Sequence, residues 1–233
     1  QSSMFLQNLK LDLICQYIVN ALDCYSNQKF SVSLGIRLCG VVMLASTLIG
    51  TCPQASGFFD YSKISQTLMI NLPIVAADDL SAVYDSLSSF LSHDSDIGNA
   101  FLTTGGKALV DLLANCSMVA FKNNTKTLAS MWKFIGSLIA CDPRKGSRVV
   151  SGSGILENSI LIIKYVMAHC DDQCSDDALK FACEVISLLL RDHANTTSSP
   201  VKTSMVTAEL QALMNNDTCS TVMRAAMCYL ARG

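Results

Sequence analysis

The chain has 233 residues, of which 50% are hydrophobic and 15% charged, and its formal net charge at pH 7 is -2. A chain of this length can bury a sizeable core, and the small share of charge indicates helices that bury more than one narrow stripe. The near-neutral balance excludes nucleic-acid binding through bulk positive charge, and also an acidic tail that mimics nucleic acid.

Apolar residues recur at helical spacing in a series of segments along the chain. Short polar turns separate these segments, so we expect helices that are adjacent in sequence to pack antiparallel. Helix pairs recur roughly every 40 residues, the period of armadillo and HEAT repeats. The sequence therefore predicts an all-α fold, an irregular α-solenoid of antiparallel helix pairs in one domain. We predict about ten helices and no strand, with the helices over 4–25, 32–52, 64–72, 80–91, 101–121, 128–141, 155–169, 178–191, 201–214 and 222–230.

The longest polar interval covers residues 142–154 and contains Pro143, Gly146 and Gly152. Because proline and glycine interrupt helices, we predict a flexible loop there. Apolar helical segments resume at the same density beyond it, so this loop is not expected to divide the chain into two domains.

The most apolar segment covers residues 41–49 and is bounded by Arg37, two glycines and Pro53. It is shorter than the roughly 18 to 20 apolar residues that a membrane span requires. We therefore predict a buried helix at this position and no membrane partner.

Eleven cysteines are present, and several, such as Cys15 and Cys183, lie in apolar helical segments. Such cysteines behave as small hydrophobic residues, and an odd number without a signal peptide favours a reducing intracellular compartment. The sequence begins with Gln1 and shows neither the basic region nor the cleavage site of a signal peptide. We expect it to be a piece of a longer protein.

None of the common catalytic or nucleotide-binding motifs appears in the sequence. The best metal candidate is the turn after the predicted helix 155–169, where His169, Cys170 and Cys174 lie close together with two aspartates. Their spacing is not that of a recognised zinc site, and a helix end, an acidic turn and the next N-cap explain the same residues. His93 and His193 fall near predicted helix C-termini, where the helix dipole favours a cation. We therefore predict no enzyme, no cofactor and no metal.

A positive cluster surrounds the predicted helix 128–141 and is opposed only by Asp142. It could present a stripe to phosphate groups if the helix and the polar interval after it share a face. The alternative is an ordinary solvated surface, because Trp132 and Phe134, the nearby aromatic residues, are expected in the core rather than stacked on bases. The cluster consists of Lys122, Lys126, Lys133, Arg144, Lys145 and Arg148.

The tripeptide formed by Ser198, Ser199 and Pro200 has the form that polo-box domains bind after phosphorylation. It could serve as a phosphorylation-dependent docking motif. The structural alternative is a serine-rich loop in which Pro200 opens the next helix.

Residues 108–118, ALVDLLANCSM, are followed after a polar gap by residues 127–135, TLASMWKFI. This pair resembles a helix pair in the amino-terminal half of the fidgetin-like-interacting regulator of recombination and mitosis family. Its sharpest match is the Trp-Lys-Phe-Ile sequence at 132–135, and the diffuse similarity spans about residues 10 to 190, without a catalytic motif.

The resemblance implies a large nuclear α-helical scaffold. Such a scaffold partners a fidgetin-like AAA ATPase and restrains recombinase filaments during recombination and crosslink repair. We therefore expect a non-catalytic protein-binding scaffold. The alternative is a nucleic-acid-binding helical repeat domain that uses the positive cluster at 122–148.

Overall fold

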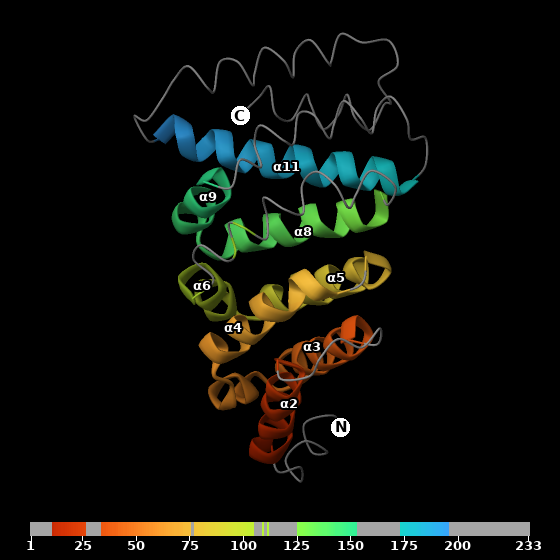
Figure 1. Cartoon of the computed structure of the whole chain (residues 1–233). Helices are drawn as coiled ribbons and strands as arrows, with labels where there is room; N and C mark the ends of the chain where they lie inside the picture. The colour runs from red at the N-terminus through yellow and green to blue at the C-terminus, as the bar shows by residue number, and fades with distance from the viewer. Residues whose placement is uncertain are drawn as a thin grey trace.

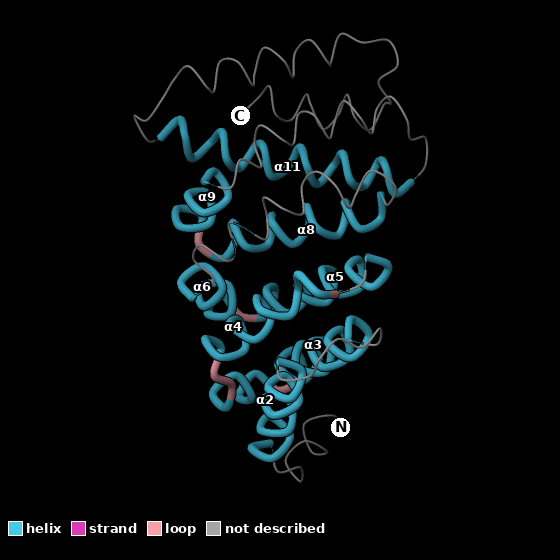
Figure 2. Tube along the Cα trace, in the orientation of Figure 1, coloured by secondary structure: helices cyan, strands magenta, loops and turns pink. Residues whose placement is uncertain are grey.

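The computed structural model describes residues 11–26, 34–75, 77–104, 109, 111, 125–152 and 173–195. In these ranges the backbone is almost entirely helical and contains no strand (Figure 2). The predicted all-α fold is confirmed. The elements are α2 (Leu11–Ser26), α3 (Leu34–Thr51), the 3-10 helix η1 (Pro53–Phe58), α4 (Tyr61–Asn71), the 3-10 helix η2 (Leu72–Ile74), α5 (Ala77–His93), α6 (Ser95–Thr104), α8 (Thr125–Cys141), α9 (Pro143–Gly152) and α11 (Gln173–Asn195).

Most predicted helices that fall in the described ranges coincide with an observed one. The segments at 32–52, 80–91, 128–141 and 178–191 become α3, α5, α8 and α11, and the segment at 64–72 becomes α4. The helix expected from residue 101 differs, because α6 already begins at Ser95 and ends at Thr104. The helices predicted over 155–169, 201–214 and 222–230 lie outside the described residues.

The helices stack in two rows, which gives the molecule its layered shape (Figure 1). In one row α3, α5, α8 and α11 pack side by side in that order, and in the other α2, α4, α6 and α9 do so. Contacts of α2 with α3, of α5 with α6 and of α8 with α9 join the rows. This stacking of repeated layers is the arrangement of an irregular α-solenoid.

Hydroxyl groups pair across the layers and reveal the repeat length. Ser46 of α3 and Ser89 of α5 lie 3.0 Å apart and are 43 positions apart in sequence. Ser81 of α5 and Ser130 of α8 lie 3.2 Å apart and are separated by 49 positions. These separations are close to the predicted period of roughly 40 residues. Small side chains let neighbouring helices approach closely while each hydroxyl finds a partner.

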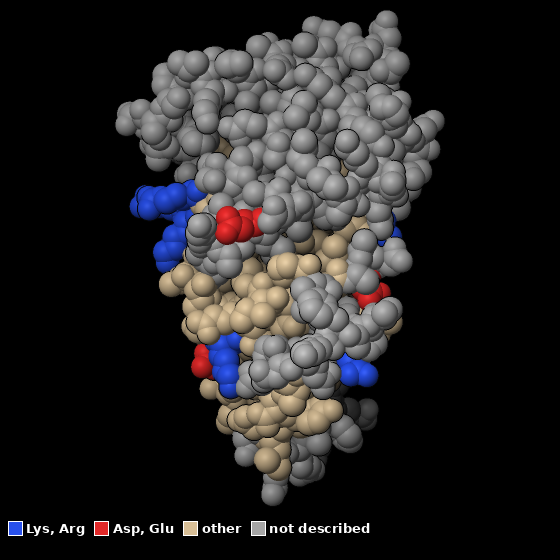
Figure 3. Space-filling model, in the orientation of Figure 1, with Lys and Arg blue, Asp and Glu red and all other residues tan. Residues whose placement is uncertain are grey.

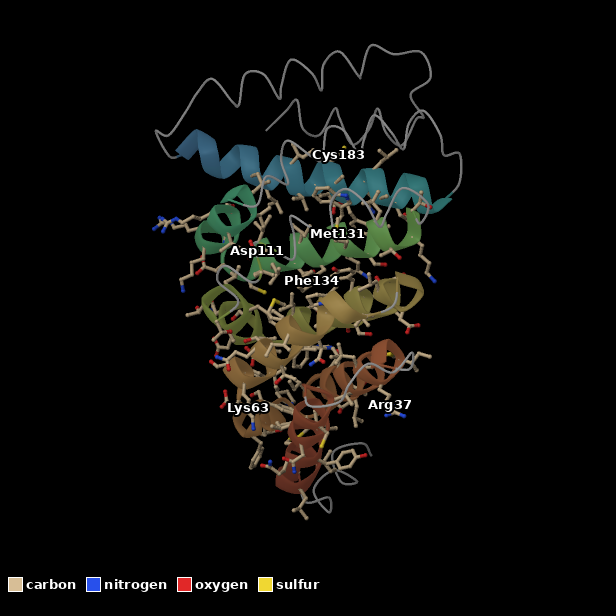
Figure 4. All side chains as sticks on the ribbon, in the orientation of Figure 1. Arg37, Lys63, Asp111, Met131, Phe134 and Cys183 are labelled. Carbon is tan, nitrogen blue, oxygen red and sulfur yellow. The ribbon has the colours of Figure 1, made fainter. Side chains whose placement is uncertain are left out.

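Aromatic side chains fill the centre of the stack. Phe134 of α8 is fully buried, and its ring centroid lies 5.6 Å from that of Tyr84 in α5 and 6.2 Å from that of Phe101 in α6. Phe134 therefore contacts a helix of each row, and Figure 4 shows it between α8 and α5. Trp132 is also buried, so the expected core positions of Trp132 and Phe134 are confirmed.

The prediction of a flexible loop over 142–154 is wrong for the ten residues of α9. Asp142 caps this helix, because its carboxylate accepts the backbone N–H of Lys145 at 3.0 Å and its carbonyl accepts that of Gly146 at 2.7 Å. Pro143 occupies the first helical position, where no amide hydrogen bond is lost. Gly146 serves packing, since a Cβ atom there would lie 2.7 Å from the Cα atom of Ile139.

Candidate functional site

The sequence-predicted metal candidates fall largely outside the described residues. His169 and Cys170 lie there, and of Cys174 the structure describes only the backbone, in the first turn of α11. Elsewhere in the described ranges, no group of three or more His, Cys, Asp or Glu side chains could hold a metal ion. The docking motif of Ser198, Ser199 and Pro200 also lies outside them.

His93 ends α5, as the sequence indicated, and its side chain is exposed. A Cβ atom on Gly50 would lie 2.8 Å from the Cε1 atom of this histidine, so the imidazole covers the backbone of α3. His193 lies in the last turns of α11, where only its backbone is described.

A half-buried hydrogen bond between two side chains lies where the two rows meet. The Tyr61 hydroxyl donates to Asp94 Oδ2 at 3.0 Å, and Asp94 Oδ1 accepts the backbone N–H of Asp96 at the start of α6. Burial and the neighbouring Asp94 raise the pKa values of the Tyr61 hydroxyl and of the Cys141 thiol above their ordinary values. A raised thiol pKa disfavours the thiolate, so Cys141 lacks the activation of a nucleophile.

The positive cluster is divided into two groups by the structure. Lys126 and Lys133 lie seven residues apart on the exposed side of α8, and Lys133 Nζ lies 3.8 Å from Asp85 Oδ1 of α5. Lys126 is about 22 Å along the helix from Cys141, next to which α9 begins. Lys122 lies outside the described residues. The structure therefore does not unite Lys126 with the basic residues of α9.

Arg144, Lys145 and Arg148 form the second group, on the exposed side of α9. Blue atoms gather at this edge of the molecule in Figure 3. Lys145 Nζ lies 3.6 Å from Asp142 Oδ2, and the backbone N–H of Lys145, followed by its charge, holds the pKa of Asp142 below its ordinary value. Within the described ranges, neither arginine forms an ion pair. Arg144 and Arg148 are four residues apart, so they share one side of α9.

Within the described ranges, the exposed large apolar side chains all belong to the part of the chain from α2 to α4, and none belongs to α9. Clusters of exposed apolar side chains on soluble proteins mark interaction surfaces. Three of the seven belong to α3. The seven exposed side chains are Leu13, Tyr17, Ile36, Met43, Leu44, Phe58 and Ile70.

The helix α3 carries two apolar faces. Its inner face packs Leu38, Val42, Ala45 and Ile49 into the core. The prediction of a buried helix over 41–49 is therefore wrong for one side of this helix, where Met43 and Leu44 are exposed. Among the helices of its row, α3 contacts α5 alone, so its outer side stays uncovered by the described helices.

The outer face, called here the α3 apolar face, consists of Ile36, Met43 and Leu44 with the small residues Gly40 and Thr47 between them. These five positions fall within an arc of about 100° on the helix, the width of the stripe that a helix normally buries. Ile36 is 66% exposed and Met43 is 54% exposed. A Cβ atom on Gly40 would have no neighbour within 4 Å, so the surface is open at this point.

A single charge borders the α3 apolar face. Arg37 is the only charged residue of α3, and it is exposed. Figure 4 shows its side chain projecting from the outer side of the helix, away from α5. No carboxylate of the described ranges pairs with it. The sequence showed that α3 is apolar all round, but it did not distinguish full burial from a second, uncovered face.

Among the described helices, none combines the length and the apolar character that a membrane span requires. In the comparisons, no family model, curated protein or solved structure matches the chain. The resemblance stated from the sequence therefore stays a prediction.

Proposed function

We propose that the chain is a non-catalytic protein-binding scaffold. It is part of a nuclear regulator of homologous recombination and DNA repair, which acts with a fidgetin-like AAA ATPase to control recombinase filaments. The observation that supports the scaffold role is the α3 apolar face, displayed on a layered stack of helices. The recombination setting rests on the family resemblance alone, which is sharpest at residues 108–118 and 127–135 and diffuse over about residues 10 to 190.

The buried residues and the exposed residues support different parts of this proposal. Trp132, Phe134 and Ile135, the sharpest part of the resemblance, are buried in α8. They stabilise the stack and contact no partner directly. Partner binding is therefore assigned to the exposed surface, where apolar side chains of α3 would be removed from water on association.

The test is a pull-down of the full-length protein from nuclear extract, with residues 11–195 intact or deleted, probed for a fidgetin-like AAA ATPase and for recombinase. The proposal expects that the intact protein retrieves the ATPase and that the deletion abolishes retrieval. Retrieval that is equally strong without residues 11–195 would assign the contact elsewhere in the protein. No retrieval by the intact protein would reject the recombination setting.

Nucleic-acid binding is the second candidate function, and the pair Arg144 and Arg148 favours it. Both guanidinium groups are exposed and four residues apart on α9, where they can contact successive phosphates. The test is a gel-shift assay at low salt with the double variant Arg144→Glu and Arg148→Glu, with Lys63→Glu on α4 as the control. If the chain binds nucleic acid through α9, the wild type and the control should give a salt-sensitive shift that only the double variant loses. A wild-type protein that shifts no DNA or RNA at low salt would reject it.

A further inference from the structure

We propose that the α3 apolar face binds an amphipathic α-helix of a protein partner, and that a carboxylate at the edge of this helix pairs with Arg37. This inference rests on the proposed scaffold function and gives it a site and a partner chemistry. It is carried by the way in which α3 already binds α5, and by the charge at the border of the face.

The contact between α3 and α5 is built on two small residues of α3 that are seven positions apart. Cys39 Sγ lies 3.1 Å from Ser86 Oγ, and Ser46 Oγ lies 3.0 Å from Ser89 Oγ. Because these side chains are small, the two helices approach closely and serine hydroxyls meet across the interface. Seven residues correspond to nearly two full helical turns, so Cys39 and Ser46 lie on one line along α3.

The outer face repeats this spacing one position further along the chain. Gly40 and Thr47 are also seven residues apart, and both are exposed. They lie on a line rotated by about 100° from the line of Cys39 and Ser46. Ile36 and Met43 flank the line on one side and Leu44 flanks it on the other. Helical geometry therefore places a line of small residues between apolar side chains on the exposed side of α3, the pattern against which the ridge of another helix packs.

The charge of Arg37, at the border of the α3 apolar face, determines which kind of helix can bind there. Arg37 and Leu44 are seven residues apart and share one edge of the face, so a helix that covers Leu44 brings its own edge to the guanidinium group. A carboxylate at that edge can accept two parallel hydrogen bonds from the arginine. A second copy of α3 cannot supply this carboxylate, because the sequence of α3 contains neither Asp nor Glu.

The experiment places the photo-crosslinking amino acid p-benzoylphenylalanine at position 43 of the full-length protein and maps the crosslinked peptide by mass spectrometry. The control carries it at position 70, since Ile70 of α4 is also exposed, at 62%. We expect position 43 to capture a segment with apolar residues three and four apart and with Asp or Glu at the edge of that stripe. Position 70 should not capture it.

The contribution of the Arg37 charge is tested with the same photo-crosslinking experiment. The variant Arg37→Glu should lower the crosslinking yield at position 43 by about tenfold, as expected for loss of one charge-assisted contact. Replacing the partner's carboxylate with Lys should restore the yield. Circular dichroism should be unchanged, because position 37 is exposed. Capture of a second copy of this chain, of a segment without helical apolar spacing, or of nothing at position 43 would overturn the inference.

A wrong binding site on α3 and a wrong recombination setting would give different experimental results. If the full-length protein with Met43→Glu still retrieves the ATPase and all its other partners, the scaffold role stands and the α3 apolar face is not the binding site. If the intact protein retrieves no ATPase while position 43 still captures an acidic amphipathic helix, the site stands and the recombination setting is wrong.

Discussion

Gly146 of α9 lies so close to Ile139 of α8 that a Cβ atom on the glycine would be 2.7 Å from the Cα atom of the isoleucine. The nearby Leu138 carbonyl oxygen would be 3.1 Å away. Both neighbours are backbone atoms of a packed helix, which cannot turn aside as a flexible side chain would. The absence of a side chain at Gly146 therefore determines how tightly α9 folds back on α8.

The variant Gly146→Ala should be less stable than the wild type by about 1–3 kcal/mol, because forced overpacking outweighs the better helix propensity of alanine. Urea unfolding followed by the fluorescence of Trp132, the single tryptophan, measures the change. The matched control is Gly40→Ala, where the added methyl group meets open space and should stabilise α3 by up to about 1 kcal/mol. A Gly146→Ala protein that unfolds at higher urea than the wild type would contradict this packing.

The stability of the protein should depend on Phe134 much more than on its sequence neighbour Lys133. Removing the ring in Phe134→Ala should cost about 3–5 kcal/mol, because it leaves a cavity between α5, α6 and α8. Lys133→Ala should cost less than about 1 kcal/mol, since its 3.8 Å ion pair with Asp85 is half exposed and screened by water. Chemical unfolding at equal protein concentration compares the two. Similar losses for both variants would show that the ring is not central.

Because of the cap of α9, the free energy of unfolding should decrease at acidic pH. The backbone N–H of Lys145 lowers the pKa of Asp142 in the folded protein. A lowered pKa contributes stability that is present above the unfolded value of about 3.9 and is lost as pH falls through the folded value. Asp142→Asn keeps an oxygen that can cap the helix, so near pH 7 it should destabilise less than Asp142→Ala. Both variants should lose less stability than the wild type on acidification. An identical acid dependence in Asp142→Asn and the wild type would contradict the cap.

Because of the Tyr61 hydroxyl, the free energy of unfolding should decrease at alkaline pH. Burial and Asp94 raise the pKa of this hydroxyl, so its contribution is present below the ordinary value of about 10 and is lost as pH rises above that value. Tyr61→Phe removes the hydrogen bond to Asp94 and should cost about 0.5–1.5 kcal/mol near pH 7. Its stability should then fall less steeply above pH 10 than that of the wild type. Thermal unfolding across this pH range measures both effects, and equal slopes would contradict the assignment.

Periodicity predicted most of the fold, because apolar residues that recur every three or four positions must be buried on one side of a helix. It failed at α9 for a physical reason. In the sequence Pro143 and Gly146 predict a break between helices, whereas in the structure the proline lies at the first helical position and the glycine at a helix contact. The pair of Asp142 and Pro143 was the available signal, since an N-cap followed by proline opens a helix.

The candidate site was less predictable than the fold. The apolar periodicity of α3 showed that the helix prefers apolar surroundings on all sides, but only its neighbours in space determine which side is uncovered. In the same way, Lys126 and Arg144 carry the same charge and lie close in sequence. The helical rise of α8 separates them, and no pattern of charge in the sequence shows this directly.

Partner binding through the α3 apolar face can be tested by replacing its apolar side chains with charged ones. Quantitative mass spectrometry compares the proteins recovered with the full-length wild type and with the double variant Ile36→Glu and Met43→Glu. The control is Ile70→Glu, an equally exposed isoleucine on α4. We expect the double variant alone to lose a discrete partner by about tenfold or more, with unchanged helix content. Identical recovery of all partners by the wild type and the double variant would contradict this expectation.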